Sequence, residues 1–277
     1  MIRSVQEVLR KRLNECAKAA LVQYRHAIVP IYGSTENGVP THIGSGTLLA
    51  LAEGHCLLTA AHIIDENKIT TLYIGVGQTE ELLCDFAITI PPSGDRRQDH
   101  HDFALTCLTP DLVARLEGAT FIKEAEIGRS VATPVGRAYT CLGFPNSKNK
   151  TPPEPANTLQ PVLYPYTGSG LKREKVASVA SDNDHIVVDF NPKYSRDESG
   201  NKVSSIGFRG CSGSAIVDLG NLSDPGTLDK DCEPLAAALV IEMHKDQKAI
   251  VGVRPTRILA MIRATKWFDE RHSWMSI

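Results

Sequence analysis

The chain has 277 residues, of which 42% are hydrophobic and 22% charged, a composition typical of a soluble globular protein with a real core. Its 30 basic and 32 acidic residues give a formal net charge of −2, which argues against a nucleic-acid groove or a basic membrane face. No stretch approaches the roughly 20 apolar residues that cross a bilayer, so neither nucleic acid nor a membrane is an expected partner.

The seven cysteines are spread along the chain without a CxxC pair, which argues against a zinc knuckle or a thioredoxin-type site. Several stand in apolar runs, where free cysteine behaves as a small buried hydrophobe. We therefore expect free thiols and a reducing compartment. Charges interrupt residues 1–25 throughout, with no apolar stretch of signal-peptide length, so the expected location is cytoplasmic.

The first predicted element is an amphipathic helix over residues 3–23. Apolar residues recur there at helical spacing, with Arg and Lys between them: Val5, Leu9, Leu13, Cys16 and Ala20. This stripe must dock either on the rest of the chain or on a partner.

Short β-rich runs follow, separated by Gly, Pro, Asn and acidic residues. They include HIGSGTLLALAE, HCLLTAAHII and DFALTCL, and a mixed connector over residues 109–129 begins with a helix-start signal, Thr-Pro-Asp. A second set of strand-like runs extends from RAYTCLGF to KAIVGVRP, after which residues 256–268 return to helical spacing. Many short strands separated by turns predict an all-β fold of barrels or a sandwich.

Two long polar segments, 145–157 and 191–205, are expected to be mobile loops. The second leads into Gly-Cys-Ser-Gly-Ser at residues 210–214, which is either a tight turn or the site of a nucleophile. Gly210 permits an unusual backbone conformation, so that the amides of Gly210 and Ser212 can point at one spot as an oxyanion hole. Cys211 and Ser214 are weaker candidates for the nucleophile, because neither follows a glycine by two positions.

A nucleophilic serine needs a base and an orienting carboxylate. His62 ends an apolar strand after three small residues and is the candidate base, although any one of nine histidines is more often a surface or core residue. Asp102 opens an apolar strand and is the candidate acid, although it could simply cap that strand. The run Asp99-His100-His101-Asp102 could suggest a metal site, but neighbouring strand residues point to opposite faces and no further ligands are suitably spaced.

Three blocks resemble the signature blocks of the trypsin/chymotrypsin-like serine peptidases, in that family's order: TAAH at 59–62, DFAL at 102–105 and GCSGS at 210–214. Residues 44–47, Gly-Ser-Gly-Thr, are similar to the family's early glycine turn. Residues 142–145, Leu-Gly-Phe-Pro, resemble the turn that often begins the second barrel of its bacterial members. The resemblance spans residues 25–265.

The resemblance implies two six-stranded antiparallel β-barrels with the active site in the cleft between them. An N-terminal helix (1–23) would precede the first barrel (24–130), and the second barrel (131–277) would end in a C-terminal helix. The resemblance further implies a serine endopeptidase that cleaves a protein or peptide through an acyl-enzyme. Ser212 would be its nucleophile, His62 its base and then acid, and Asp102 the partner of His62. No metal or organic cofactor is expected.

Two departures from digestive members of the family are visible. Ile63 follows His62, so the disulfide beside the catalytic histidine is absent, and Cys211 stands where those enzymes carry the aspartate that pairs with a new N-terminus. The chain is therefore more similar to the disulfide-free bacterial or intracellular branch, and activation by zymogen cleavage is not expected. A regulatory protein partner that orders the 191–205 loop is one possibility, and an ordinary surface loop is the other.

Substrate preference depends on residues that the resemblance assigns less directly. An ungapped alignment puts Ile206 at the base of the specificity pocket, which argues against a simple preference for Arg or Lys. Glu242 near the pocket wall would reverse that preference, and Gly252 lies in a strand similar to the last pocket-forming strand. The alternative to an enzyme is a catalytically silent protein-binding module on the same fold.

Overall fold

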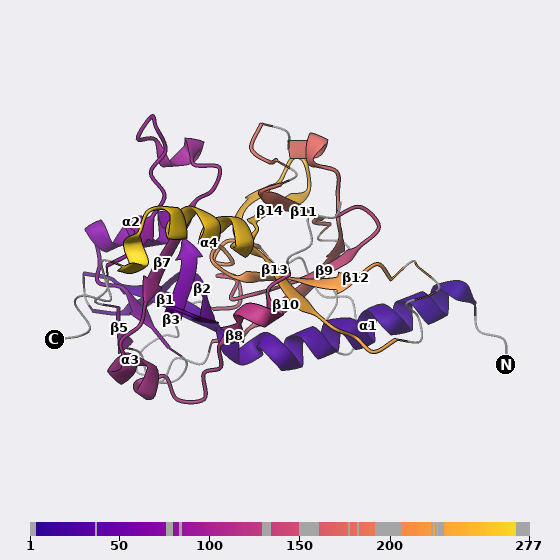
Figure 1. Cartoon of the computed structure of the whole chain (residues 1–277), viewed down its shortest axis with the longest axis horizontal. Coiled ribbons are helices and arrows are strands. Elements are labelled where there is room, and N and C mark those ends of the chain that lie inside the picture. The colour runs from indigo at the N-terminus through magenta and orange to yellow at the C-terminus, as the bar shows by residue number, and fades with distance from the viewer. Residues whose placement is uncertain are drawn as a thin grey trace.

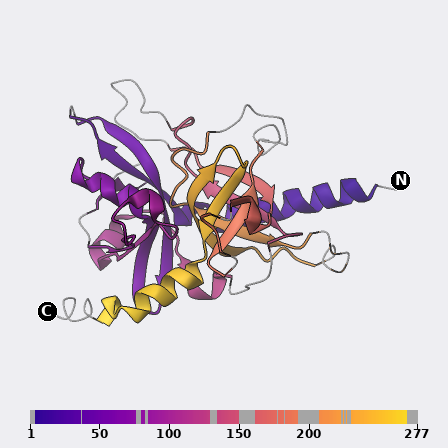
Figure 2. The same ribbon diagram turned by 90° about the horizontal axis from the view of Figure 1, so that it is seen from above.

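The computed structural model describes residues 4–269 except for 37, 76–79, 83–84, 129–133, 150–160, 177, 182, 192–206, 223, 225 and 227–229. Two antiparallel β-sheets form the body of the protein, and a long helix extends from it at the N-terminal end (Figures 1 and 2). The described helices are α1 (Val5–Tyr24), η1 (Arg25–Ala27), α2 (Ala61–Asp65), η2 (Glu66–Lys68), η3 (Arg96–Gln98), α3 (Pro110–Arg115), η4 (Glu124–Glu126), η5 (Arg173–Val176) and α4 (Pro255–Ala264).

Helix α1 confirms the predicted N-terminal helix. It begins with a capping box, in which Ser4 and Glu7 each bond the other's backbone N–H. Its buried residues, Cys16, Ala20 and Tyr24, lie toward its C-terminal end, and the Tyr24 hydroxyl donates to the carbonyl of Pro234 at 2.7 Å. The helix thus packs on this chain through its second half, while its first half projects from the body (Figures 1 and 2).

A disulfide joins Cys16 of α1 to Cys232, with 5.3 Å between their Cα atoms. The expectation of free thiols only is therefore wrong for this pair, and the chain is not disulfide-free. The two cysteines are 216 residues apart, so only the tertiary packing of α1 brings them together. Among the described residues, four other cysteines are buried: Cys56, Cys107, Cys141 and Cys211.

The first sheet holds eight strands in the described part of the chain. They are β1 (Ile28–Ser34), β2 (Pro40–Leu51), β3 (Gly54–Ala60), β4 (Tyr73–Ile74), β5 (Glu80–Glu81), β6 (Ala87–Ile88), β7 (Phe103–Cys107) and β8 (Ile122–Lys123). Their order is β5-β4-β1-β2-β3-β7-β6, with β8 parallel to β2. The sheet therefore has more strands than the predicted six, and four of its eight strands are only two residues long.

Among the described residues, the second sheet has six strands, as predicted. They are β9 (Ala138–Gly143), β10 (Tyr164–Ser169), β11 (His185–Asp189), β12 (Ala215–Gly220), β13 (Leu235–His244) and β14 (Ala249–Val253). Their order is β10-β9-β12-β13-β14-β11. The sheet curls until its two ends meet, because Gly170 after β10 bridges to Val188 of β11 and Leu171 donates to the carbonyl of Val187 at 2.8 Å.

The largest hydrophobic cluster is shared by both sheets, so they form one body. It includes Leu58 and Phe103 from the first sheet with Leu142 and Ile241 from the second. Helix α4 confirms the predicted C-terminal helix and adds Ile258, Leu259 and Ile262 to this core. Burial of such side chains contributes about 1.5–3 kcal/mol each.

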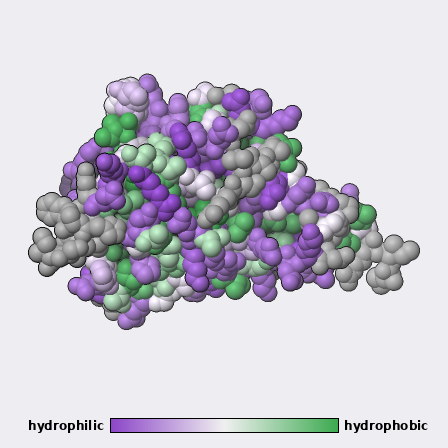
Figure 3. All heavy atoms as spheres, in the orientation of Figure 1, coloured by the Kyte–Doolittle hydropathy of each residue, from purple (hydrophilic) through white to green (hydrophobic). Residues whose placement is uncertain are grey.

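Helix α4 also returns from the second sheet toward the first (Figure 2). Its Arg263 side chain forms ion pairs with Glu53 at 2.6 Å and Glu124 at 3.1 Å. On the face in Figure 3, hydrophobic and hydrophilic residues are interspersed. No helix among the described residues is both long enough and apolar enough to cross a membrane.

Candidate active site

His62 stands where a buried strand becomes a short helix. Strand β3 ends at Ala60, helix α2 begins at Ala61, and Ile63 is buried in the core beneath them. This anchoring leaves the His62 ring at the surface, with 38% of its side chain exposed. A histidine in this place is held by its backbone while its ring remains accessible.

Asp102 reaches His62 from the start of the neighbouring strand, β7. Its Oδ1 accepts the backbone N–H of His62 at 2.9 Å, and its Oδ2 lies 2.5 Å from the ring Nδ1. A backbone bond from Ala61 N–H to the Asp102 carbonyl, at 3.0 Å, ties the same two segments together. In a neutral ring, Nδ1–H therefore donates to the carboxylate, and Nε2 is the nitrogen that carries the lone pair.

The Asp102 backbone is strained and its carboxylate is poorly solvated. Its φ is +38°, a left-handed conformation that costs a non-glycine residue roughly 1–3 kcal/mol. Only 10% of its side chain is exposed. Burial raises the pKa of Asp102, and this effect outweighs the lowering by the hydrogen bond and charge of His62.

The turn at residues 210–214 docks on strand β2 through a set of hydrogen bonds. The Ser45 hydroxyl donates to the Gly210 carbonyl at 2.8 Å, and the Ser45 backbone N–H donates to the Ser212 carbonyl at 2.9 Å. The Thr47 hydroxyl donates to the Gly213 carbonyl at 3.0 Å. Gly213, at φ +85°, approaches so closely that a Cβ there would collide with the Ser45 carbonyl and with Thr59.

Contacts of β2 place this turn beside His62. A Cβ on Gly44 would lie 2.6 Å from Cδ1 of Ile63, the residue after His62, and the next residue, Ser45, bonds the carbonyl of Ser212. The Thr59 hydroxyl, three residues before His62, also donates to the Ser45 carbonyl at 2.7 Å. The structure therefore brings the serine turn against the strand end that carries the histidine.

The peptide between Arg209 and Gly210 is oriented by Asn146. The Asn146 backbone N–H donates to the Arg209 carbonyl at 2.7 Å. Because a trans peptide points its C=O and N–H in opposite directions, the Gly210 N–H is aimed away from Asn146. Among the described residues, neither the Gly210 nor the Ser212 N–H donates to a protein acceptor, as an oxyanion hole requires.

Cys211, between these two amides, is buried with 4% exposure in the apolar cluster of the second sheet, which also contains Phe208. Burial raises the pKa of the Cys211 thiol far above its usual range, so the thiol stays protonated and is a poor nucleophile. Apolar packing of Cys211 thus holds the centre of the turn.

The Ser212 hydroxyl does not bond His62 in this structure. It donates to the carbonyl of Ile241 on β13 at 3.3 Å, a long and weak hydrogen bond. The hydroxyl can leave this acceptor by rotation about χ1 between staggered rotamers.

Of the three residues predicted to form the specificity pocket, the structure describes two, Glu242 and Gly252. Glu242 follows Ile241 on β13, close to Ser212, and its carboxylate lies 3.0 Å from Nε2 of His244. Gly252 faces the interior of the second sheet, because a Cβ there would lie 2.6 Å from Cδ1 of Ile216. Ile206 lies outside the described residues, as do residues 150–157 and 192–205 of the two predicted loops.

The run Asp99–Asp102 forms no metal centre in the described part of the chain, where no cluster of three potential ligands occurs. Asp99 instead accepts the backbone N–H groups of His101 and Asp102. Sequence reasoning missed this role, as it missed those of Ser45 and Asn146. The available signals were the two turns of the sequence, because Ser45 lies within Gly-Ser-Gly-Thr and Asn146 directly follows Leu-Gly-Phe-Pro.

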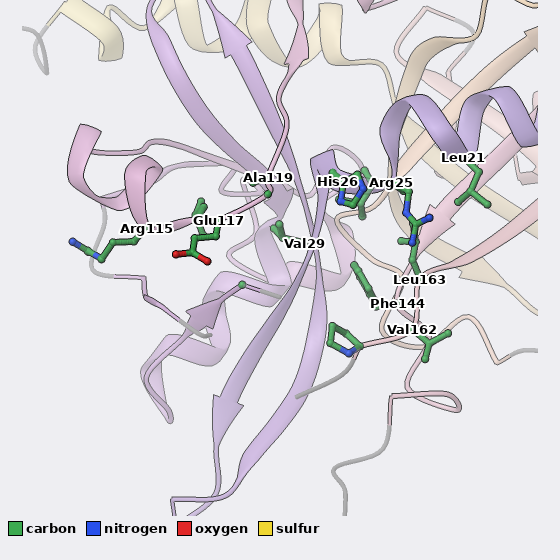
Figure 4. A pocket seen from close by; sticks show the side chains of 15 residues that line it. Leu21, Arg25, His26, Val29, Arg115, Glu117, Ala119, Phe144, Val162 and Leu163 are labelled. Atoms are coloured by element: carbon green, nitrogen blue, oxygen red, sulfur yellow. The ribbon is translucent and has the colours of Figure 1, made fainter. Parts of the chain in front are cut away.

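A cavity of about 500 Å³ is enclosed by the C-terminal end of α1, the first sheet and the segment just before β10, which contributes Val162 and Leu163 (Figure 4). Arg25 and His26 line it on one side and Arg115 and Glu117 on the other, with Phe144 among its apolar lining residues. His62, Asp102 and Ser212 are not among the lining residues, so this hollow is separate from the candidate active site.

Comparisons with known proteins agree with the fold. No family model and no curated protein sequence matches the chain. The crystal structure of the serine endoprotease from Yersinia pestis is similar with a TM-score of 0.50 at 14% identity, over 90% of this chain and 65% of that one. Glu endopeptidase in complex with MPD (TM-score 0.48, 14% identity, 87% of this chain and 90% of that one) and Vibrio cholerae VesB protease (0.49, 14%, 84% and 61%) score lower. The all-β, chymotrypsin-like fold predicted from the sequence is thus confirmed, whereas likeness at such identities says nothing of activity.

Proposed function

We propose that this protein is a serine endopeptidase in which Ser212, His62 and Asp102 act as the catalytic triad. The observation that carries the proposal is the double contact between Asp102 and His62. One carboxylate oxygen holds the histidine backbone at 2.9 Å and the other holds its Nδ1 at 2.5 Å. This contact fixes both the orientation and the tautomer of the ring, as a general base requires.

The reaction proceeds through an acyl-enzyme. Nε2 of His62 takes the proton of the Ser212 hydroxyl as Oγ attacks the substrate carbonyl carbon. The N–H groups of Gly210 and Ser212 donate to the resulting oxyanion. His62 then gives the proton to the leaving amine, and water, activated by the same nitrogen, releases the acyl group from Ser212.

The end of β13 supplies a surface suited to a peptide substrate. Residues 242–244 pair with β14 on one side, while β12 pairs with β13 only up to Leu239. Among the described residues, the other side of 242–244 is therefore an unpaired strand edge, next to the nucleophile. An extended peptide can add to such an edge through main-chain hydrogen bonds, which favours a polypeptide substrate.

Ser212→Ala and His62→Ala test this assignment. Each variant should reduce peptide cleavage by several orders of magnitude and leave the folded structure intact. Ser214→Ala is the matched control, because this serine belongs to the same turn, is fully buried, and has a hydroxyl without a hydrogen-bond partner among the described residues. Undiminished cleavage by purified Ser212→Ala would refute the proposal.

The second candidate function is a protein-binding module without catalysis, and the bond from the Ser212 hydroxyl to Ile241 favours it. A fluorophosphonate probe separates the two, since it reacts with an activated serine whatever the natural substrate. Labelling that Ser212→Ala abolishes supports the peptidase. A wild-type protein that the probe does not label supports the binding module.

A further inference from the structure

One guanidinium joins the two segments that carry His62 and Asp102. Arg96 lies in η3, with 23% of its side chain exposed. Its Nε donates to Oδ2 of Asp65 at 2.8 Å and its Nη1 to Oδ2 of Asp99 at 2.5 Å. Asp65 ends helix α2 three residues after His62, and Asp99 stands three residues before Asp102. Arg96 thus links the segment that follows His62 to the segment that precedes Asp102.

The Asp99 carboxylate passes this restraint on to Asp102. Its Oδ1 accepts the backbone N–H of Asp102 at 3.0 Å and that of His101 at 3.2 Å. Its Oδ2 also accepts the Thr89 hydroxyl at 2.5 Å, and 5% of its side chain is exposed. These bonds hold the backbone where Asp102 adopts φ +38°, and the direction of the Asp102 carboxylate follows from that backbone.

The Asp65 contact restrains the histidine side. Helix α2 is only five residues long, so its own hydrogen bonds do little to hold it. A second cation, Lys68, pairs with Asp65 at 2.9 Å but is 77% exposed, and such a pair contributes little. Arg96 is the better-buried partner, and it is held further by donating to the Thr89 carbonyl at 2.5 Å.

Charged and titratable groups face the bridge from several sides. Asp99 and Asp102 are neighbouring carboxylates, and after burial, the main cause, the charge of Asp99 also raises the pKa of Asp102. Arg96 supplies the opposite charge at Asp99, and His62 faces Asp102 on its other side. From the second sheet, His101 is met by Asp184 at 3.4 Å, and Asp184 by Arg257 at 3.0 Å.

We propose that Arg96 is a positioning residue that locks Asp65 to Asp99 and so keeps the Asp102 carboxylate aligned on the His62 ring. It does not touch the reacting atoms. Its kinetic effect rests on the proposed peptidase function, whereas its effect on the His62 ring does not.

The test compares Arg96→Ala, Arg96→Lys and a control, Arg97→Ala. Arg97 is the next residue, is 88% exposed, and pairs with Asp95 at the surface. On a peptide that the wild type cleaves, Arg96→Ala should lower kcat by roughly 100-fold, as expected for a misplaced catalytic group, with KM unchanged. Arg96→Lys should restore part of kcat, and Arg97→Ala should behave as wild type.

Proton NMR of the low-field His62 Nδ1–H resonance gives a second readout that needs no turnover. Arg96→Ala should shift or broaden this resonance, and Arg97→Ala should not. An unchanged resonance together with wild-type kcat in Arg96→Ala would overturn the proposal. If that variant does not fold, Asp65→Asn, which removes one ion pair of the bridge, decides by the same criteria. If the wild type cleaves nothing, the peptidase assignment fails and the resonance alone tests the bridge.

Discussion

Replacing Gly210 by alanine tests the geometry of the oxyanion hole. Gly210 has φ +94°, and a side chain at such a φ costs roughly 1–2 kcal/mol. The new Cβ would also lie 2.8 Å from the Phe144 carbonyl and 2.9 Å from Cγ of Asn146. The first of these atoms belongs to the backbone and cannot easily retreat, so we expect the Arg209–Gly210 peptide to rotate.

That rotation would turn the Gly210 N–H away from the oxyanion. Loss of one such donor costs about 10²–10³ in kcat, or about 2.7–4 kcal/mol. The backbone strain alone should lower Tm by only a few degrees, because 1 kcal/mol corresponds to about 2–4 °C in proteins of roughly this size. Gly210→Ala should therefore lose most of its turnover while it remains folded at assay temperature.

The assay is steady-state cleavage of a peptide, with Tm measured on the same samples. Gly207→Ala is the matched control, because a Cβ at Gly207 would meet no atom of the described residues within 4 Å. It should keep wild-type kcat and Tm. A wild-type kcat in Gly210→Ala would refute the proposed role of this amide.

Two further predictions concern ionisable groups. Asp102→Asn should lower kcat by about 10⁴-fold, because the amide favours the wrong tautomer of His62. Burial raises the pKa of Asp102 in the folded state, so ionisation of this carboxyl destabilises the fold as the pH rises through the folded-state pKa. Over that pH range, the Tm of the wild type should fall relative to the Tm of Asp102→Asn. Burial lowers the pKa of His42, despite an opposing hydrogen bond from its ring to Oδ1 of Asn146. The folded state therefore favours the neutral ring, and the stability gained in this way should be lost as the pH falls below about 6.5. Thermal melts of the wild type and His42→Gln between neutral and acid pH check this, and an equal acid sensitivity in both would contradict it.

Short motifs allowed the candidate site residues to be predicted from the sequence. His62 follows a buried strand, and Ser212 follows a glycine that needs positive φ, so their local sequence reveals how their backbones are held. The position of Asp102 left two interpretations open, a strand cap or a buried carboxylate with a partner, and the order of the three blocks favoured the second. Strand patterning likewise predicted the long strands, in which buried residues dominate.

The contacts that support the candidate site could not be predicted from the sequence, because each joins residues that meet only in the folded chain. Arg96 belongs to a charged surface-like run, and its sequence does not show that Asp65 and Asp99 converge on it. Ser45 was part of a recognised turn, but its hydroxyl bonds the carbonyl of Gly210, which is 165 residues away along the chain. The two-residue strands were unpredictable in number, since so short a segment has no periodicity.

The link between Cys16 and Cys232 encloses most of the polypeptide in a covalent ring. A single cut of the backbone anywhere inside that ring leaves both pieces attached to each other. A molecule nicked there, by itself or by another enzyme, would migrate as an intact species on a denaturing gel until a reductant separated its fragments.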